Sequence, residues 1–117
     1  VFLHMSYVSP YVKNHLKYYI KTHKDIFSKV DLSNGAQDLP FLVTDVHTDL
    51  FIELFSEADV KSINLLDCTL LTENSVIGIL KHFGENLMEL FLSNINFGEN
   101  FINTLHLCRH LKVLTLK

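Results

Sequence analysis

Seven histidines and two cysteines are the residues whose chemistry could support a metal site or nucleophilic catalysis. His106 and His110 are four residues apart, a spacing that places two imidazoles on one face of a helix, where they can share a metal ion. Cys108 lies between them, at a step of two residues that points to another face. The chain has no His-Glu-x-x-His motif and no Cys-x-x-Cys pair. We therefore expect surface histidines around a buried cysteine, with no bound metal or cofactor.

The other reactive side chains also follow no catalytic pattern. Cys68 comes directly after an apolar segment, at a position where we expect a turn and a buried, unreactive thiol. No motif pairs any of the acidic residues as an acid and a base, and these include Glu53, Glu57, Asp59, Asp67 and Glu73. A phosphate loop of the G-x-x-x-x-G-K type is also absent from the sequence. The sequence therefore predicts that the protein is not an enzyme.

Composition limits the class of protein further. The 117 residues suffice for one domain, and the 48% of hydrophobic residues excludes a disordered chain. Two cysteines exclude a disulfide scaffold, and no apolar run approaches the ~18–20 residues of a membrane span. Lys and Arg number 10 against 13 Asp and Glu, for a net charge of −3, which argues against a nucleic-acid binder. We expect no membrane partner.

An amphipathic helix is expected over residues 9–28, with Ser9 as its N-cap and Pro10 at its first position. Its apolar stripe consists of Val12, Leu16, Tyr19, Ile20, His23, Phe27 and Val30. A row of lysines follows the same helical steps on another face: Lys13, Lys17, Lys21 and Lys24. This row either binds an anionic partner, such as a nucleic acid, or is the solvated face that amphipathic helices usually have.

Apolar residues recur with a fixed spacing after residue 59. The recurring positions are Val60, Ile63, Leu65 and Cys68, then Leu87, Leu90, Leu92 and Ile95, then Leu111, Leu114 and Leu116. The steps from Ile63 to Leu90 and from Leu90 to Leu114 are 27 and 24 residues, within the range of leucine-rich repeats. Val30 and Leu32 fit an irregular first unit. The spacing predicts parallel strands near 29–33, 62–66, 89–93 and 113–117.

Helices are expected between these strands. One covers residues 44–56, after a turn at Asn34-Gly35 and a break at Leu39-Pro40, and its apolar face holds Val46, Leu50, Phe51, Leu54 and Phe55. A second begins at Thr72 and turns inward Val76, Ile77, Ile79, Leu80 and Phe83. A third begins near residues 98–100, with Asn100 as a cap and with Phe101, Ile102 and Leu105 inward.

Two segments, 68–80 and 108–116, resemble the cysteine-containing, ribonuclease-inhibitor-like subtype of the leucine-rich repeat. The first is similar to its pattern C-x-x-I-T-D-x-x-L-x-x-L, with Leu71 for the isoleucine and Glu73 for the aspartate, and the second follows C-x-x-L-x-x-L-x-L; Gly84 and Ile95 replace cysteines of the pattern. The resemblance implies an α/β leucine-rich repeat solenoid of parallel strands and returning helices. Residues 1–28 would then be an N-terminal helical cap, 29–59 an irregular first repeat, and 60–117 repeats truncated at the C-terminus, so that the chain is a fragment of a longer protein.

Repeats of this subtype are typical of substrate receptors of cullin-type ubiquitin ligases. The resemblance therefore implies a protein–protein interaction module that selects substrates in such a ligase. The order of helix, strand, Leu39-Pro40 and helix is similar to zyg/zer-like receptors, which bind elongin C. An F-box receptor, which binds a Skp-type adaptor, is the second form. A repeat scaffold outside any ligase is the alternative.

The expected strands also indicate a binding surface, since their outward residues alternate with the buried ones. Residues expected there are Lys61, Asn64, Leu66, Glu89, Phe91, Ser93, Val113 and Thr115. Leu66, Phe91 and Val113 are apolar among polar neighbours, which indicates a protein partner; alternatively, Phe91 packs against a cap or a neighbouring domain. The unpaired cysteines suit a reducing compartment, so we expect a cytoplasmic or nuclear protein.

Overall fold

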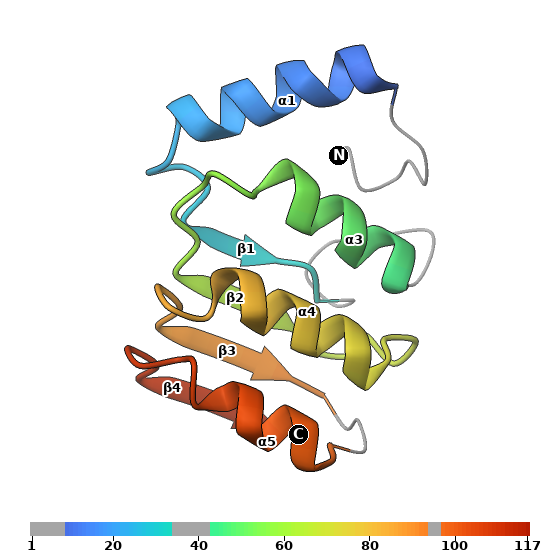
Figure 1. The fold of residues 1–117 in the computed structure, drawn as a ribbon, viewed down its shortest axis with the longest axis vertical. Helices are drawn as coiled ribbons and strands as arrows, with labels where there is room; N and C mark the ends of the chain where they lie inside the picture. The colour runs from blue at the N-terminus through green and yellow to red at the C-terminus, as the bar shows by residue number, and fades with distance from the viewer. Residues whose placement is uncertain (1–8, 34–42, 94–96) are drawn as a thin grey trace.

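The computed structural model describes residues 9–33, 43–93 and 97–117, and its centre is one parallel sheet. The strands are β1 (Lys29–Asp31), β2 (Ser62–Leu65), β3 (Glu89–Leu92) and β4 (Val113–Leu116), and they lie side by side in the order of the sequence. Figure 1 shows the helices between them returning the chain for each next strand. The expected α/β class and the four parallel strands are therefore confirmed.

The register of the sheet follows the recurring apolar spacing. Val30 pairs with Ile63, Ile63 with Leu90, and Leu90 with Leu114. Alternation along each strand turns Ile63, Leu90 and the residues two positions after them toward the helices, where they are buried. The strands end one or two residues before the expected limits.

The described residues form four helices beside the sheet: α1 (Pro10–Thr22), α3 (Asp45–Leu54), α4 (Glu73–Phe83) and α5 (Glu99–Leu105). Figure 1 shows α3, α4 and α5 side by side over one face of the sheet, and α1 beyond the β1 end. Neighbouring helices pack in chain order, with α1 against α3, α3 against α4, and α4 against α5. The described part of the chain is thus two layers, with α1 as an end cover.

Side-chain caps explain where most of these helices begin. The Ser9 hydroxyl accepts from the Val12 N–H at 3.3 Å, and the Thr72 hydroxyl accepts from the Ser75 N–H. At α3, the Thr44 N–H donates to Nδ1 of His47 at 2.9 Å. The expectation that Asn100 caps the last helix is wrong, because α5 begins at Glu99 and Gly98 is its N-cap.

The first helix is shorter and less buried than expected. It ends at Thr22 rather than at residue 28. At this end the Thr22 hydroxyl donates to the Tyr18 carbonyl oxygen at 2.9 Å. Such side-chain bonds compete with continuation of the helix. Of the expected apolar stripe, Ile20 alone is fully buried, while Val12 and Tyr19 are exposed, because α1 meets the rest of the protein mainly along α3.

The core between the sheet and the helices largely follows the expected pattern. All five residues expected to face inward from α4 are buried, whereas Val46 of α3 and Ile102 of α5 are exposed, contrary to expectation. Aromatic rings connect the helices: Phe27 lies 5.7 Å from Phe55, centroid to centroid, and Phe51 stacks on Phe83 at 5.0 Å. The contact between Phe27 and Phe55 ties the segment after α1 to the body of the protein.

Several expectations lie outside the described residues. They are the turn at Asn34-Gly35, the break at Leu39-Pro40, the position of Ile95, and residues 1–8 of the N-terminal cap. The division of the chain into units at residues 28 and 59 stays a prediction.

Candidate protein-binding face of the sheet

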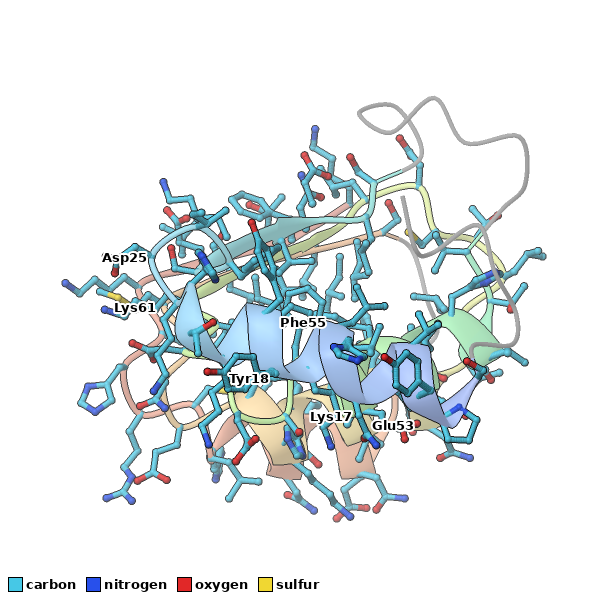
Figure 2. All side chains as sticks on the ribbon, turned by 90° about the horizontal axis from the view of Figure 1, so that it is seen from above. Lys17, Tyr18, Asp25, Glu53, Phe55 and Lys61 are labelled. Atoms are coloured by element: carbon cyan, nitrogen blue, oxygen red, sulfur yellow. The ribbon has the colours of Figure 1, made fainter. Side chains whose placement is uncertain are left out.

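The face of the sheet opposite α3, α4 and α5 is covered by no helix within residues 9–33, 43–93 and 97–117. In Figure 2 the strands lie on one side of the molecule and α4 and α5 on the other. Because neighbouring strands are in register, the side chains of this face form two rows across all four strands. They are Lys29, Ser62, Glu89 and Val113, and Asp31, Asn64, Phe91 and Thr115. We call this surface the open face.

The residues expected from the sequence to bind a partner do not all lie on the open face. Asn64, Phe91 and Thr115 are direct neighbours in one row, and Glu89 pairs with Val113 in the other. Leu66 and Ser93 follow the carboxyl ends of β2 and β3. Lys61 lies apart from these rows, before the first residue of β2, where it is exposed.

Phe91 is the central apolar residue of the open face. Its side chain is half-buried between Asn64 and Thr115, and Val113 on the next strand is exposed. An aromatic residue surrounded by polar groups is typical of the centre of a protein–protein contact. The open face therefore offers both contact area and hydrogen-bonding groups.

Polar side chains at the carboxyl end of the open face also fix the turns that follow the strands. Asn64 Oδ1 accepts from the Leu66 N–H at 3.0 Å, and Asp31 Oδ1 accepts from the Ser33 N–H at 2.9 Å. Asp67 then adopts a φ of 63°, a left-handed conformation that Asp tolerates better than most residues, and its N–H donates to the Ser93 hydroxyl. The bond between Asp67 and Ser93 joins the end of β2 to the end of β3.

Cys68 is buried, as its place after the strand predicts. Its thiol donates to the Leu32 carbonyl oxygen at 3.2 Å. Burial, together with the nearby carboxylates of Asp67 and Asp31, raises the pKa of the Cys68 thiol to about 11. At neutral pH this side chain is a neutral thiol rather than a nucleophilic thiolate. Burial also raises the pKa of Cys108 above its usual value.

The histidines near Cys108 are at the surface. His106 and His110 are both exposed, and Cys108 between them is buried and free of any disulfide. In the described ranges, no group of three or more His, Cys, Asp or Glu side chains is placed to hold a metal ion. None of the helices there combines the length and the apolar character that crossing a membrane requires.

Two of the four lysines in the row, three of which lie on α1, make contacts inside the protein. The ammonium of Lys13 lies 3.1 Å from Glu53, and that of Lys21 lies 3.4 Å from Glu57. Lys17 is half-buried, and Lys24 is exposed. Figure 2 shows Lys17 and Glu53 on the same side of α1. These two ion pairs join α1 to the segment around α3. They engage two of the four lysines, so the row is a weaker candidate for nucleic-acid contact than the sequence alone indicates.

Sequence reasoning missed a series of contacts between the helix starts. Asp45, in the first turn of α3, accepts from the Thr72 N–H at 3.1 Å and from the Thr72 hydroxyl at 2.8 Å. Glu73, in the first turn of α4, accepts from the Gly98 N–H at the start of α5. A signal was present in the sequence, because an acid follows directly after the capping residue in each of the three helices.

The acid at the start of α3 has a shifted pKa. Burial acts to raise the pKa of Asp45, but hydrogen bonds from Ser75 and Thr72 outweigh it and hold this pKa below the usual value. Asp45 therefore stays ionised in the folded protein and stabilises both helix starts, where a negative charge is favoured by the helix dipole.

Comparisons with protein-family models, with curated proteins and with solved structures found no match to this chain.

Proposed function

We propose that this chain is a protein–protein recognition module that binds its partner on the open face of the sheet. The observation that carries the proposal is the row of Asn64, Phe91 and Thr115, which lie next to one another on three strands with no helix of the described chain over them. A half-buried aromatic residue among polar neighbours supplies the apolar anchor that protein interfaces favour. Neither cysteine is a thiolate at neutral pH, which favours binding over thiol catalysis.

The finer form of the proposal is a leucine-rich repeat solenoid that selects substrates for a cullin-type ubiquitin ligase in the cytoplasm or nucleus. Its support is the resemblance of segments 68–80 and 108–116 to the cysteine-containing repeat, together with the constant register of the strands. Elongin C, or a Skp-type adaptor, is then the second partner. A repeat scaffold that binds proteins outside any ligase is the alternative.

Affinity capture of the full chain from cells, read by quantitative mass spectrometry, tests both forms. We expect Phe91→Ala and Thr115→Arg each to reduce the captured partner about tenfold or more, since central interface residues carry most of the binding energy. Ile102→Ala, which alters an exposed side chain on the helical side, is the matched control and is expected to change little. Thermal melting of each variant shows whether the fold is retained.

The outcomes separate the possible functions. An adaptor recovered together with a cullin supports the ligase receptor, and other proteins recovered without them support the scaffold. If folded Phe91→Ala and Thr115→Arg proteins capture the same partners as the wild type, the open face is not the binding surface.

A further inference from the structure

A hollow at the amino ends of the strands adjoins the open face. Its volume is about 290 Å³, and its lining residues are Ser28, Lys29, Lys61, Ser62, Met88, Glu89, Lys112 and Val113. A neighbouring hollow of about 530 Å³ shares Lys61, Met88 and Lys112 with it. Because Glu89 and Val113 also belong to the open face, a partner seated on that face reaches the hollow without a break. We call this hollow the lysine hollow.

The backbone holds the lysine hollow in place. The N–H groups of Met88 and Glu89 both donate to the carbonyl oxygen of Lys61, at 2.7 and 3.0 Å. The N–H groups of Lys112 and Val113 donate in the same way to the carbonyl oxygen of Met88, at 2.8 and 3.1 Å. These bonds place Met88 between Lys61 and Lys112, and each of the three residues directly precedes a strand. The backbones of the two lysines are therefore spaced by hydrogen bonds that continue the sheet.

The lysine hollow carries an excess of positive charge in a chain whose net charge is −3. Three lysines line it against one carboxylate, that of Glu89. Lys61 lies 3.7 Å from Asp59, but both side chains are about half exposed, so this pair is weak. Lys29 and Lys112 make no ion pair with any residue that the structure describes. Both ammonium groups are thus available to an incoming anion.

The lysine hollow also has apolar surface. Met88 is half-buried and Val113 is exposed, so an apolar side chain of a ligand can pack between the lysines. The flexible thioether of Met88 adapts to side chains of different shape. The distance from β1 to β4 is about 14 Å at the usual spacing of strands, which about four residues of an extended peptide span.

We propose that the lysine hollow binds an acidic segment of the protein partner. Carboxylates of that segment pair with the ammonium groups of Lys29 and Lys112, and one of its apolar side chains packs on Met88. This inference rests on the proposed function, because it names the chemistry of the partner that the open face binds. A peptide fits better than a nucleic acid. Glu89 inside the hollow and Asp59 beside it repel a continuous chain of phosphates, whereas a peptide can place its carboxylates away from them.

The experiment measures binding of a fluorescein-labelled peptide, with four glutamates around a central leucine, by fluorescence anisotropy in low salt. We expect the double variant Lys29→Gln with Lys112→Gln to weaken binding about tenfold, and added salt to weaken binding to the wild type. The matched control is Lys81→Gln with Lys117→Gln, which removes the same charge from two exposed lysines outside the hollow and is expected to change affinity less than about twofold.

Four results would overturn the inference. They are no binding of the acidic peptide to the wild type, equal weakening by the two double variants, equal binding of a peptide with glutamines in place of glutamates, and tighter binding of labelled oligothymidine that also depends on Lys29 and Lys112. The last result would assign the hollow to nucleic-acid phosphates. If the peptide does not bind but capture of the partner still depends on Phe91, this inference alone is rejected. If the peptide binds but capture of the partner does not depend on Phe91, the proposed function alone is rejected.

Discussion

At the β1 end of the sheet, α1 packs beside α3 and buries Ile20, whereas the strand at the other end has no such cover among the described residues. There the two helix-facing leucines of β4, Leu114 and Leu116, are 40% and 51% exposed. Their register partners on β3, Leu90 and Leu92, are fully buried. The same residue type at paired positions of neighbouring strands therefore has two different surroundings.

The difference between the ends shows that burial here depends on the neighbouring strand and helix rather than on the residue type. Each strand and the helix beside it present an apolar edge, and the next strand and helix cover that edge. The first-turn acids follow the same rule. Asp45 and Glu73 each bond to the start of the next helix, while Glu99 of α5 accepts no hydrogen bond from the described residues.

The largest expected effect compares the register partners Leu90 and Leu114. Leu90→Ala leaves a cavity in the core and is expected to lower the free energy of unfolding by about 2–5 kcal/mol. Leu114→Ala removes a side chain that already meets water and is expected to cost less than about 1 kcal/mol. Urea unfolding of both variants measures the difference. Equal losses would show that Leu114 is buried in solution and that the two ends do not differ.

A smaller effect is expected at the helix starts. Asp45→Ala removes both hydrogen bonds to Thr72 and is expected to cost about 1–3 kcal/mol. Glu99→Ala, the equivalent change in α5, removes only a favourable interaction with the helix dipole and is expected to cost no more than about 0.5 kcal/mol. Urea unfolding at pH 7 compares the two, and a greater loss for Glu99→Ala would contradict the proposed rule.

The pH dependence of this effect has a definite sign. The pKa of Asp45 is lower in the folded protein than in the unfolded chain, so the folded state binds fewer protons on acidification. The contribution of the Asp45 carboxylate to the free energy of unfolding is complete above the pKa of the unfolded chain. It is lost as the pH falls through the pKa of the folded protein, below about 4. The difference in stability between the wild type and Asp45→Ala should therefore narrow between pH 5 and pH 3, as urea unfolding at each pH would show.

The strands were the most predictable part of this fold. Leu90 and Leu92 are two residues apart, and the spacing of Leu90 from Ile63 and Leu114 falls in the range of the repeat, so both the strands and their register follow from the sequence. The inward face of α4 was predictable for the same reason. Periodicity shows which residues share a face, but it does not show whether a neighbour covers that face. The exposure of Leu114, Val46 and Ile102 was therefore missed.

The candidate site was predictable only in part. Alternation along the strands identified Asn64, Phe91 and Thr115 as one row, because their positions depend on backbone geometry alone. The lysine hollow was missed because Lys29 and Lys112 are far apart in the sequence. They come to line one hollow only through the order of strands β1 to β4 in the sheet. The contacts of Lys13 and Lys21 were missed because they depend on how α1 is placed against the segment around α3.

The smallest expected effect compares an ion pair at each end of the sheet. Lys13 and Glu53 join α1 to α3 at 3.1 Å, and their side chains are 25% and 48% exposed. Arg109 and Glu85 lie near the β4 end at 3.5 Å, and both side chains are 74% exposed. A double-mutant cycle to alanine should give a coupling of about 0.2–1 kcal/mol for the first pair and a value near zero for the second, because solvent screens the more exposed charges.

Salt provides the control for this comparison. Raising the ionic strength to 1 M shortens the screening distance to about 3 Å and should remove most of the coupling between Lys13 and Glu53. If the coupling remains unchanged, the contact between these side chains is apolar packing of the lysine stem rather than charge attraction. A larger coupling for Arg109 and Glu85 than for Lys13 and Glu53 would mean that the β4 end is the better covered end in solution, and it would reverse the comparison.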